Sequence, residues 1–258
     1  MRPESTAIVT GGARGIGQSI CVELARRGAD VVVADLNGDE MAETETLVEE
    51  TGQRCVGVET DVSSADSVGS TVDWVLDEFG SIECLVNNAG IAGPTAPCED
   101  VQPEDWEQTL AVNLKGPFQM CRAVIPQMKQ ASYGRIVNIA SVTGKRPLPN
   151  RTPYATSKMG VIGLTRTLAA EVGGENINVN AVCPGSVEGP RIRKVFERQA
   201  SETGRTYEEI RGDVERETAR GELVEREDVA DLVGYLCSEQ SKRITGQDIN
   251  VSAGKIMY

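Results

Sequence analysis

The 258-residue sequence contains no histidine, and this absence excludes several kinds of chemistry. Serine and cysteine hydrolases that depend on an imidazole base are excluded, and a zinc site would lack its usual nitrogen ligand. The seven cysteines are scattered and form no C-x-x-C pair, so we expect reduced packing thiols and no metal site. Acid-base chemistry must therefore come from Tyr, Lys, Cys or carboxylate side chains.

Long apolar runs are also absent. No segment approaches the roughly 18 consecutive apolar residues of a membrane-spanning helix. The N-terminus has no basic region followed by an apolar one, so a secretory signal is not predicted. We therefore expect a cytoplasmic protein that does not contact a membrane.

Positive charge is scarce, because 26 Lys and Arg residues face 39 Asp and Glu residues and leave a net charge of −13. Binding to nucleic acid needs a basic face, so no nucleic-acid partner is expected. Two interpretations of the acidic surface remain open. The protein is either an ordinary acidic enzyme or a salt-adapted one, in which high net charge maintains solubility.

Short runs rich in Val, Ile and Leu alternate with longer amphipathic stretches along the whole chain. The runs predicted to be strands are 7–10, 30–34, 55–59, 82–86, 135–140, 178–182 and 247–251. The continuous apolar stretch 31–33 is typical of a parallel sheet that is covered by helices on both faces. We expect an α/β fold over a single domain, 1–258, with a doubly wound, Rossmann-type, seven-stranded parallel sheet.

The segment 186–226 departs from this alternation. A turn rich in Pro and Gly leads into two charged stretches, 191–198 and 207–220, which predict an inserted pair of helices. Long insertions in compact domains often close over a binding site, so we expect a helical substrate lid. A solvated pair of surface helices is the alternative.

A glycine-rich turn, TGGARGIG at residues 10–17, follows the first predicted strand and opens a helix. Glycines at 11, 15 and 17 permit a tight turn and let the backbone approach a pyrophosphate. The N–H groups of the helix N-terminus favour the same anion. The turn therefore predicts dinucleotide binding by Gly11, Arg14, Gly15, Ile16 and Gly17.

Asp35 closes the second predicted strand, where a carboxylate can bind the adenosine ribose hydroxyls and repel a 2′-phosphate. This favours NAD over NADP. Arg14 in the glycine turn gives the opposite signal if it meets a 2′-phosphate, and otherwise faces solvent or lies at the helix cap. We give Asp35 more weight, because a carboxylate repels a phosphate whichever cation lies nearby.

Further motifs follow in order: Asp61-Val62, Asn87-Asn88-Ala89-Gly90, Asn113, Ser141, a Y-x-x-x-K pair formed by Tyr154 and Lys158, and Pro184-Gly185. With the glycine turn, they make the chain similar to the short-chain dehydrogenase/reductase family from about residue 7 to 251. Residues four apart lie on one face of a helix. Lys158 is therefore placed to favour the phenolate of Tyr154, whose ordinary pKa is near 10.

The resemblance implies a role for each motif. Tyr154 exchanges the proton, Lys158 also holds the nicotinamide ribose, Ser141 binds the substrate oxygen and Asn113 carries a water that links the lysine to solvent. Singly, Tyr154 can be a packing aromatic, Ser141 a turn hydroxyl and Asn113 a helix-kinking residue. The cofactor residues implied are Asp61 and Val62 for the adenine, 87–90 (with Asn88, Ala89 and Gly90) for the ribose side, and Pro184, Gly185 and Val187 for the nicotinamide.

Two departures from the family pattern lie outside the proton-transfer residues. Gly189 replaces a threonine that contacts the carboxamide, and 251–254 reads VSAG where VDGG is common. The residues expected to line the substrate pocket are Gly93, Pro94, Thr143, Arg146, Leu148, Arg151, Ser186, Glu188 and the lid from Arg191 onward. Arg146 or Arg151 would clamp a carboxylate, unless each forms an ordinary surface ion pair.

We therefore predict a short-chain alcohol dehydrogenase or reductase that uses NAD. Its pocket and its 4% aromatic content favour a small polar substrate such as a polyol, sugar, sugar acid or hydroxy acid. A 3-oxoacyl-thioester reductase is the alternative, and a non-catalytic NAD-binding sensor or scaffold is the alternative from another class. The helical stretches 106–130 and 153–172 match those through which family members pair, so a homotetramer is expected.

Overall fold

The structure, a computed structural model, describes residues 5–258 apart from the side chains of Arg191 and Glu202. Its centre is a parallel sheet of seven strands in the order β3-β2-β1-β4-β5-β6-β7. The strands are β1 (Ser5–Thr10), β2 (Ala29–Asp35), β3 (Cys55–Glu59), β4 (Cys84–Asn87), β5 (Gly134–Ile139), β6 (Ile177–Pro184) and β7 (Asp248–Val251). The predicted doubly wound sheet is confirmed, and each strand end lies within two residues of its predicted position.

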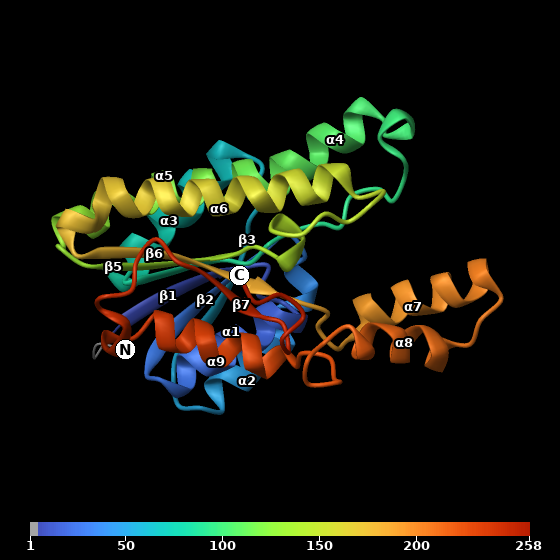
Figure 1. Ribbon diagram of the computed structural model, residues 1–258. Helices are drawn as coiled ribbons and strands as arrows, with labels where there is room; N and C mark the ends of the chain where they lie inside the picture. Colours follow the sequence, from blue (N-terminus) through green and yellow to red (C-terminus); the bar gives the residue numbers. More distant parts are fainter. Residues whose placement is uncertain (1–4) are drawn as a thin grey trace.

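Helices cover both faces of the sheet (Figure 1). One face carries α1 (Gly15–Arg26), α2 (Ala42–Glu49) and α9 (Arg226–Leu236). The other face carries α3 (Ala65–Phe79), α5 (Gly116–Gln130) and α6 (Thr152–Val172), with α4 (Pro103–Leu110) beyond them. The chain order reverses between β1 and β4, and in sheets of this kind ligands bind outside the carboxyl ends of the strands at that point.

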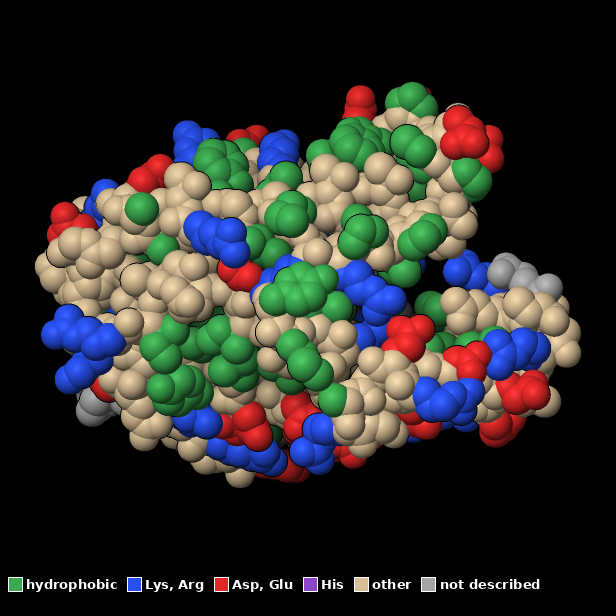
Figure 2. All heavy atoms as spheres, viewed as in Figure 1, with side chains coloured by type: hydrophobic (Ala, Val, Ile, Leu, Met, Phe, Trp, Pro, Cys, Tyr) green, Lys and Arg blue, Asp and Glu red, His purple; other side chains and the backbone are tan. Residues whose placement is uncertain are grey.

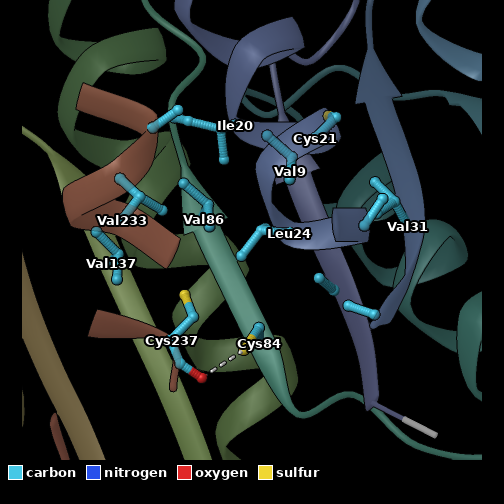
Figure 3. Close-up of a cluster of buried hydrophobic side chains, with 14 of the residues drawn as sticks. Val9, Ile20, Cys21, Leu24, Val31, Cys84, Val86, Val137, Val233 and Cys237 are labelled. Atoms are coloured by element: carbon cyan, nitrogen blue, oxygen red, sulfur yellow. Dashed lines mark hydrogen bonds between the residues drawn. The ribbon is translucent and has the colours of Figure 1, made fainter. Parts of the chain in front are cut away.

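Each face of the sheet has its own apolar layer. Figure 3 shows Ile20 and Leu24 of α1 with Val233 of α9 against Val9 and Val86 of the sheet. The thiols join this packing: the Cys84 thiol donates to the Cys237 carbonyl oxygen at 3.7 Å. Strands buried on both faces explain why the sequence shows unbroken apolar runs instead of alternation.

Two helices, α7 (Pro190–Thr203) and α8 (Tyr207–Arg216), extend beyond the carboxyl edge of the sheet (Figure 1). They enclose a small apolar cluster of their own, centred on Phe196, Ile210 and Leu223. A capping box between Thr206 and Glu209 starts α8. The predicted helical pair is therefore confirmed, and its separate core lets it hold its shape while projecting from the sheet.

Candidate active site

The glycine turn after β1 is shaped by contacts that leave no room for side chains. Gly11 and Gly15 have φ of +64° and +62°, where glycine is favoured. A Cβ on Gly17 would lie inside van der Waals contact of the Gly11 carbonyl oxygen and 2.6 Å from Nδ2 of Asn88. Beside Gly15 no heavy atom lies within 4 Å of a built Cβ, so the turn is open there. This cradle at the N-terminus of α1 fits a pyrophosphate.

Asn88 reinforces that turn. Its Nδ2 donates to the carbonyl oxygens of Thr10 at 3.0 Å and Gly11 at 2.8 Å. The backbone N–H groups of Asn88 and Ala89 donate to the Thr10 hydroxyl. The Asn88 side chain therefore positions the turn, which leaves the backbone of 88–90 as the part that faces the crevice.

Asp35 lies against the same turn. Its carboxylate accepts from the backbone N–H of Ala13 at 3.1 Å and of Asn37 at 3.2 Å, which fixes its direction at the end of β2. Arg14 is 74% exposed and pairs with Glu40 at 2.9 Å. Of the two interpretations of Arg14, the structure supports the solvent-facing one, with Glu40 as its partner.

Three other predicted cofactor residues differ in burial. The Asp61 carboxylate accepts from the backbone N–H and the hydroxyl of Ser63, at 2.8 and 2.7 Å. Val62 is buried beneath Gly116, whereas Ile16 is partly buried against the α1 side of the core. Asp61 is thus held at the carboxyl edge of β3 while Val62 anchors its loop.

Tyr154 and Lys158 lie one turn apart on α6, as their spacing predicted. The Lys158 ammonium nitrogen lies 5.8 Å from the centre of the Tyr154 ring and donates to the Ile139 carbonyl oxygen at 2.8 Å. Lys158 is only 5% exposed, so its charge acts in a poorly hydrated setting. A cation so placed favours the ionised form of a phenol.

Ser141 follows the end of β5, on a segment that packs against α6. It starts a short 3-10 helix, η4 (Val142–Gly144), and its hydroxyl accepts from the Thr143 backbone N–H at 3.1 Å. A Cβ on Gly144 would lie 2.9 Å from the Lys158 carbonyl carbon, so η4 packs directly on α6. The hydroxyl is buried beside the helix that carries Tyr154.

Asn113 is fully buried in a π-helical segment, η3 (Ala111–Lys115). Its Oδ1 accepts from the Ile91 N–H at 2.8 Å, and its Nδ2 donates to the Ile91 carbonyl at 2.9 Å and the Ser157 hydroxyl at 3.2 Å. Its side chain thus joins the loop after β4 to α6. The helix-kinking interpretation agrees with the π turn, which redirects backbone carbonyls and is frequent at functional sites.

The segment 88–90 links the two halves of the site. A Cβ on Gly11 would lie 2.8 Å from Cα of Ala89, and one on Gly90 would lie 3.2 Å from Oδ1 of Asn113 and 3.7 Å from Nζ of Lys158. The glycine turn, Asn113 and Lys158 therefore lie next to one another around 88–90 at the carboxyl edge of the sheet.

The assignment of Asn87 to the ribose side is not supported by its side chain. Nδ2 of Asn87 donates to Oδ1 of Asn138 at 2.8 Å, and Asn138 donates in turn to the Thr165 hydroxyl at 2.9 Å. All three residues are buried. Asn87 and Asn138 are directly paired on β4 and β5, so two asparagines at matching strand positions were the signal for this internal network.

The segment 184–187 is the part predicted to hold the nicotinamide. The Gly185 N–H donates to the Val251 carbonyl at 2.8 Å. Val187 pairs with Val224 through its neighbours: the Ser186 carbonyl accepts from Val224, and the Glu188 N–H donates to it. Polar groups of successive residues in extended chain alternate in direction, so the N–H and C=O of Val187 point away from Val224. This orientation suits a carboxamide contact.

Ion pairs join the helical insertion at 186–226 to the rest of the protein. Glu217 pairs with Lys255 at 2.9 Å and with Arg146 at 3.6 Å, while Arg211 pairs with Glu188 at 2.9 Å within the insertion. Arg146 therefore follows the ion-pair interpretation. Gly189 has φ +151° where the chain turns into α7, a conformation that a threonine rarely adopts. The side chain of Arg191, also expected in the pocket, lies outside the described residues.

Figure 2 shows a hollow between the lid and the upper layer of helices, with charged side chains on its floor. Arg151, which sequence reasoning gave only a substrate role, lies at this end of α6. Its guanidinium carbon is 5.0 Å from the centre of the Tyr154 ring, and its Nη2 donates to the Ala92 carbonyl at 2.7 Å. Its position three residues before Tyr154 was the available signal.

The cysteines contribute packing. All seven are reduced and six are buried. Burial raises the pKa of the Cys121 thiol to about 12 and that of Cys183 to about 11, so neither is a ready nucleophile. Within residues 5–258, no cluster of three or more Cys, Asp or Glu side chains is arranged to hold a metal ion, and no helix is long and apolar enough to cross a membrane.

Comparison with known proteins decides the family. The short chain dehydrogenase family model matches residues 5–201. The chain belongs to the short-chain dehydrogenase/reductase family. It is 36% identical over 253 residues to the 3-oxoacyl-[acyl-carrier-protein] reductase FabG of Thermotoga maritima. This match covers 97% of each of the two chains. It is 34% identical to the D-beta-hydroxybutyrate dehydrogenase of Rhizobium meliloti, over 96% of this chain and 97% of that one.

Among solved structures, an NAD+-bound xylitol dehydrogenase superposes with a TM-score of 0.93 at 31% identity, covering 98% of this chain and 99% of the other. The short-chain dehydrogenase/reductase assignment therefore agrees with the fold as well as with the sequence. As a member of this family, the protein is an oxidoreductase that binds a nicotinamide cofactor.

Proposed function

We propose that this short-chain dehydrogenase/reductase interconverts a secondary alcohol and a ketone with NAD, using Tyr154 for proton transfer. The observation that carries the proposal is the buried Lys158 ammonium beside the Tyr154 ring, next to the segment 88–90 that packs on the glycine turn. The alternative, a sensor or scaffold that binds NAD without chemistry, gives no reason for a buried lysine beside that tyrosine.

In the proposed mechanism, the bound nicotinamide supplies the hydride chemistry, and the chain supplies orientation and proton transfer. The Ser141 hydroxyl holds the substrate oxygen. Tyr154 takes a proton from an alcohol, or gives one when a carbonyl is reduced, and Lys158 favours the phenolate needed for the first direction. Asn113, in the π-helical segment, would carry a water that links Lys158 to solvent.

The same proposal assigns the cofactor residues. The backbone of Gly11, Gly15, Ile16 and Gly17 would hold the pyrophosphate, and Lys158 and Tyr154 would bind the nicotinamide ribose. Asp61 and Val62 would contact the adenine, and the backbone of 88–90 the ribose side. Pro184, Gly185 and Val187 would hold the nicotinamide. The open space beside Gly15 and the direction of the Val187 backbone support these assignments.

NAD is proposed as the cofactor because Asp35 is held against the glycine turn by two backbone bonds. A fixed carboxylate there can accept from the ribose hydroxyls and repels a 2′-phosphate. Arg14, the residue with the opposite preference, is paired with Glu40. The NAD+-bound xylitol dehydrogenase among the similar structures is consistent with this choice.

The substrate proposed is a small polar molecule: a polyol, sugar, sugar acid or hydroxy acid. The charged side chains beside the hollow in Figure 2 support this class, as do the similar xylitol and D-beta-hydroxybutyrate dehydrogenases. A 3-oxoacyl thioester is the second candidate, favoured by the 36% identity to the Thermotoga maritima reductase. An assay with NAD over sugars, sugar acids, polyols and acyl thioesters separates the two.

Replacing Tyr154 with Phe tests the reaction. The variant keeps the ring but loses the hydroxyl, so kcat should fall by about 10²- to 10⁴-fold, the usual range for a proton-transfer group. NAD affinity, measured by calorimetry, should change little. Undiminished turnover would refute the mechanism, and NAD binding without turnover in the wild type on every substrate class would favour the sensor.

We further propose that residues 1–258 act as one dinucleotide-binding and catalytic domain, with the lid at about 186–226, in a cytoplasmic homotetramer. An apolar groove of about 460 Å³ on α4, η3, α5 and α6 supports assembly through these helices. Its lining includes Trp106, Leu110, Leu114, Phe118 and Leu164. Phe118 is 47% exposed, and a partner helix packed in the groove would bury its ring.

A further inference from the structure

Arg151 occupies a position where helices rarely place arginine. It is the N-cap of α6, where Ser, Thr, Asp and Asn are favoured because they accept bonds from the first N–H groups. An arginine side chain has no acceptor, and its charge opposes the positive end of the helix dipole. Breaking a local rule at this point, three residues before Tyr154, indicates a role outside the helix.

The geometry places that charge at the proton-transfer ring. The guanidinium carbon of Arg151 lies 5.0 Å from the centre of the Tyr154 ring, closer than the Lys158 ammonium at 5.8 Å. The bond from Arg151 to the Ala92 carbonyl, 2.7 Å, holds the guanidinium in place. A second bond, from the Ala96 N–H to the Asn150 carbonyl at 3.0 Å, ties the same two loops together.

We propose that Arg151 is a positioning residue for Tyr154, which holds the phenol ring and adds a second positive charge beside it. The inference rests on the proposed proton-transfer function of Tyr154. The charged groups described at the ring are Lys158 from α6 and Arg151 at its N-cap. Both charged neighbours stabilise the phenolate, so Arg151 adds to Lys158 instead of replacing it.

The test is a titration of Tyr154 that needs no substrate. Tyrosinate absorbance is recorded against pH for the full-length protein and for Tyr154→Phe, and the difference isolates one of the five tyrosines. In Arg151→Gln the midpoint should rise by about one pH unit, the effect expected on losing a nearby opposite charge. Arg151→Lys keeps the charge and should retain most of the wild-type midpoint.

Arg166→Gln is the matched control. It removes an arginine from the same helix, three turns beyond Tyr154, where the side chain is 62% exposed and paired with Asp248. Its Tyr154 midpoint should equal that of the wild type. An unshifted midpoint in Arg151→Gln overturns the proposal, and so does an Arg151→Lys variant that shifts as far as the glutamine variant.

A kinetic measurement separates this role from substrate binding. If the panel assay finds an alcohol that is oxidised, kcat/KM is measured against pH. The midpoint of the acid limb should shift to higher pH in Arg151→Gln by the same amount as the Tyr154 midpoint in the titration. A rise in KM confined to anionic substrates, with no movement of the limb, would instead make Arg151 a carboxylate contact. If no substrate is oxidised, the proposed function fails while the titration still reports on Arg151.

Discussion

Gly17 lies so close to the rest of the glycine turn that no side chain fits at this position. A Cβ there would overlap the carbonyl oxygen of Gly11 in the glycine turn and press on Nδ2 of Asn88, which bonds to that turn. Gly17→Ala must displace the turn, at a cost of about 1–3 kcal/mol for overpacking. We expect the dissociation constant for NAD, measured by calorimetry, to rise at least tenfold, about 1.4 kcal/mol.

Gly69→Ala provides the matched control in α3. No heavy atom lies within 4 Å of a Cβ built on Gly69, which is already helical. Alanine there should raise stability by about 0.5–1 kcal/mol and leave NAD affinity unchanged. Equal NAD affinity in Gly17→Ala and Gly69→Ala would contradict the role given to the turn.

Asp35 determines cofactor choice by its charge in the proposed mode. Asp35→Asn removes the repulsion of a 2′-phosphate and keeps one side-chain oxygen, which accepts from the N–H of either Ala13 or Asn37 in place of both. The ratio of kcat/KM for NADP to that for NAD should rise at least tenfold, equivalent to about 1.4 kcal/mol. Steady-state kinetics with both cofactors measures it.

Asp39→Asn is the control for Asp35, because it removes the same charge from the adjacent 3-10 helix, η1 (Gly38–Glu40). Its cofactor ratio should stay close to that of the wild type. A wild-type preference for NADP, or an equal response in the two variants, would count against the assignment.

At the scale of elements, the α7–α8 pair has an apolar cluster of its own, and ion pairs of Glu217 join its end to the body. Glu217, at the end of α8, pairs with Lys255 and Arg146, and its ion pair with Lys255 lowers the pKa of its carboxyl. Because the folded pKa is lowered, this attachment is present above the ordinary glutamate pKa and is lost as pH falls through the folded value.

Glu217→Gln should therefore loosen the lid at neutral pH. Each partly exposed pair contributes about 0.2–1 kcal/mol, so hydrogen exchange should quicken several-fold in α7 and α8 but not in the sheet. Glu197→Gln removes the Arg193–Glu197 pair, which lies within α7, and should leave that exchange nearly unchanged. Faster exchange of α7 and α8 in Glu197→Gln than in Glu217→Gln would contradict this role of the Glu217 ion pairs.

At the scale of the molecule, the apolar groove on α4, α5 and α6 predicts self-association. A homotetramer of the 27.6 kDa chain has a mass of about 110 kDa, which light scattering measures directly. Phe118→Glu puts a charge into the groove and should lower that mass, since burying an unpaired charge is costly. Leu36→Glu, at a site that is 61% exposed, should not. A monomeric wild type would exclude the tetramer.

Residue patterns alone were enough to predict the sheet, its strands and the helical insertion of this protein. Sheet type, strand positions and the helical insertion follow from local spacing, because burial on both faces imposes unbroken apolar runs. The Tyr154–Lys158 pair also follows, since four residues make one helical turn. Asn87 shows the limit: its motif points to the cofactor, but its side chain turns into the core toward Asn138.

What the sequence by itself determined is the kind of chemistry and the edge of the sheet where it occurs: no imidazole, one phenol beside a lysine, and one phosphate-binding turn. The tertiary structure alone decided which partner each of these polar side chains takes within the protein. Asn88 donates to the glycine turn, Arg14 pairs with Glu40, and Arg151 lies over the Tyr154 ring. The reason is physical, because a side chain's partner depends on neighbours brought close by folding, and spacing along the chain does not specify them.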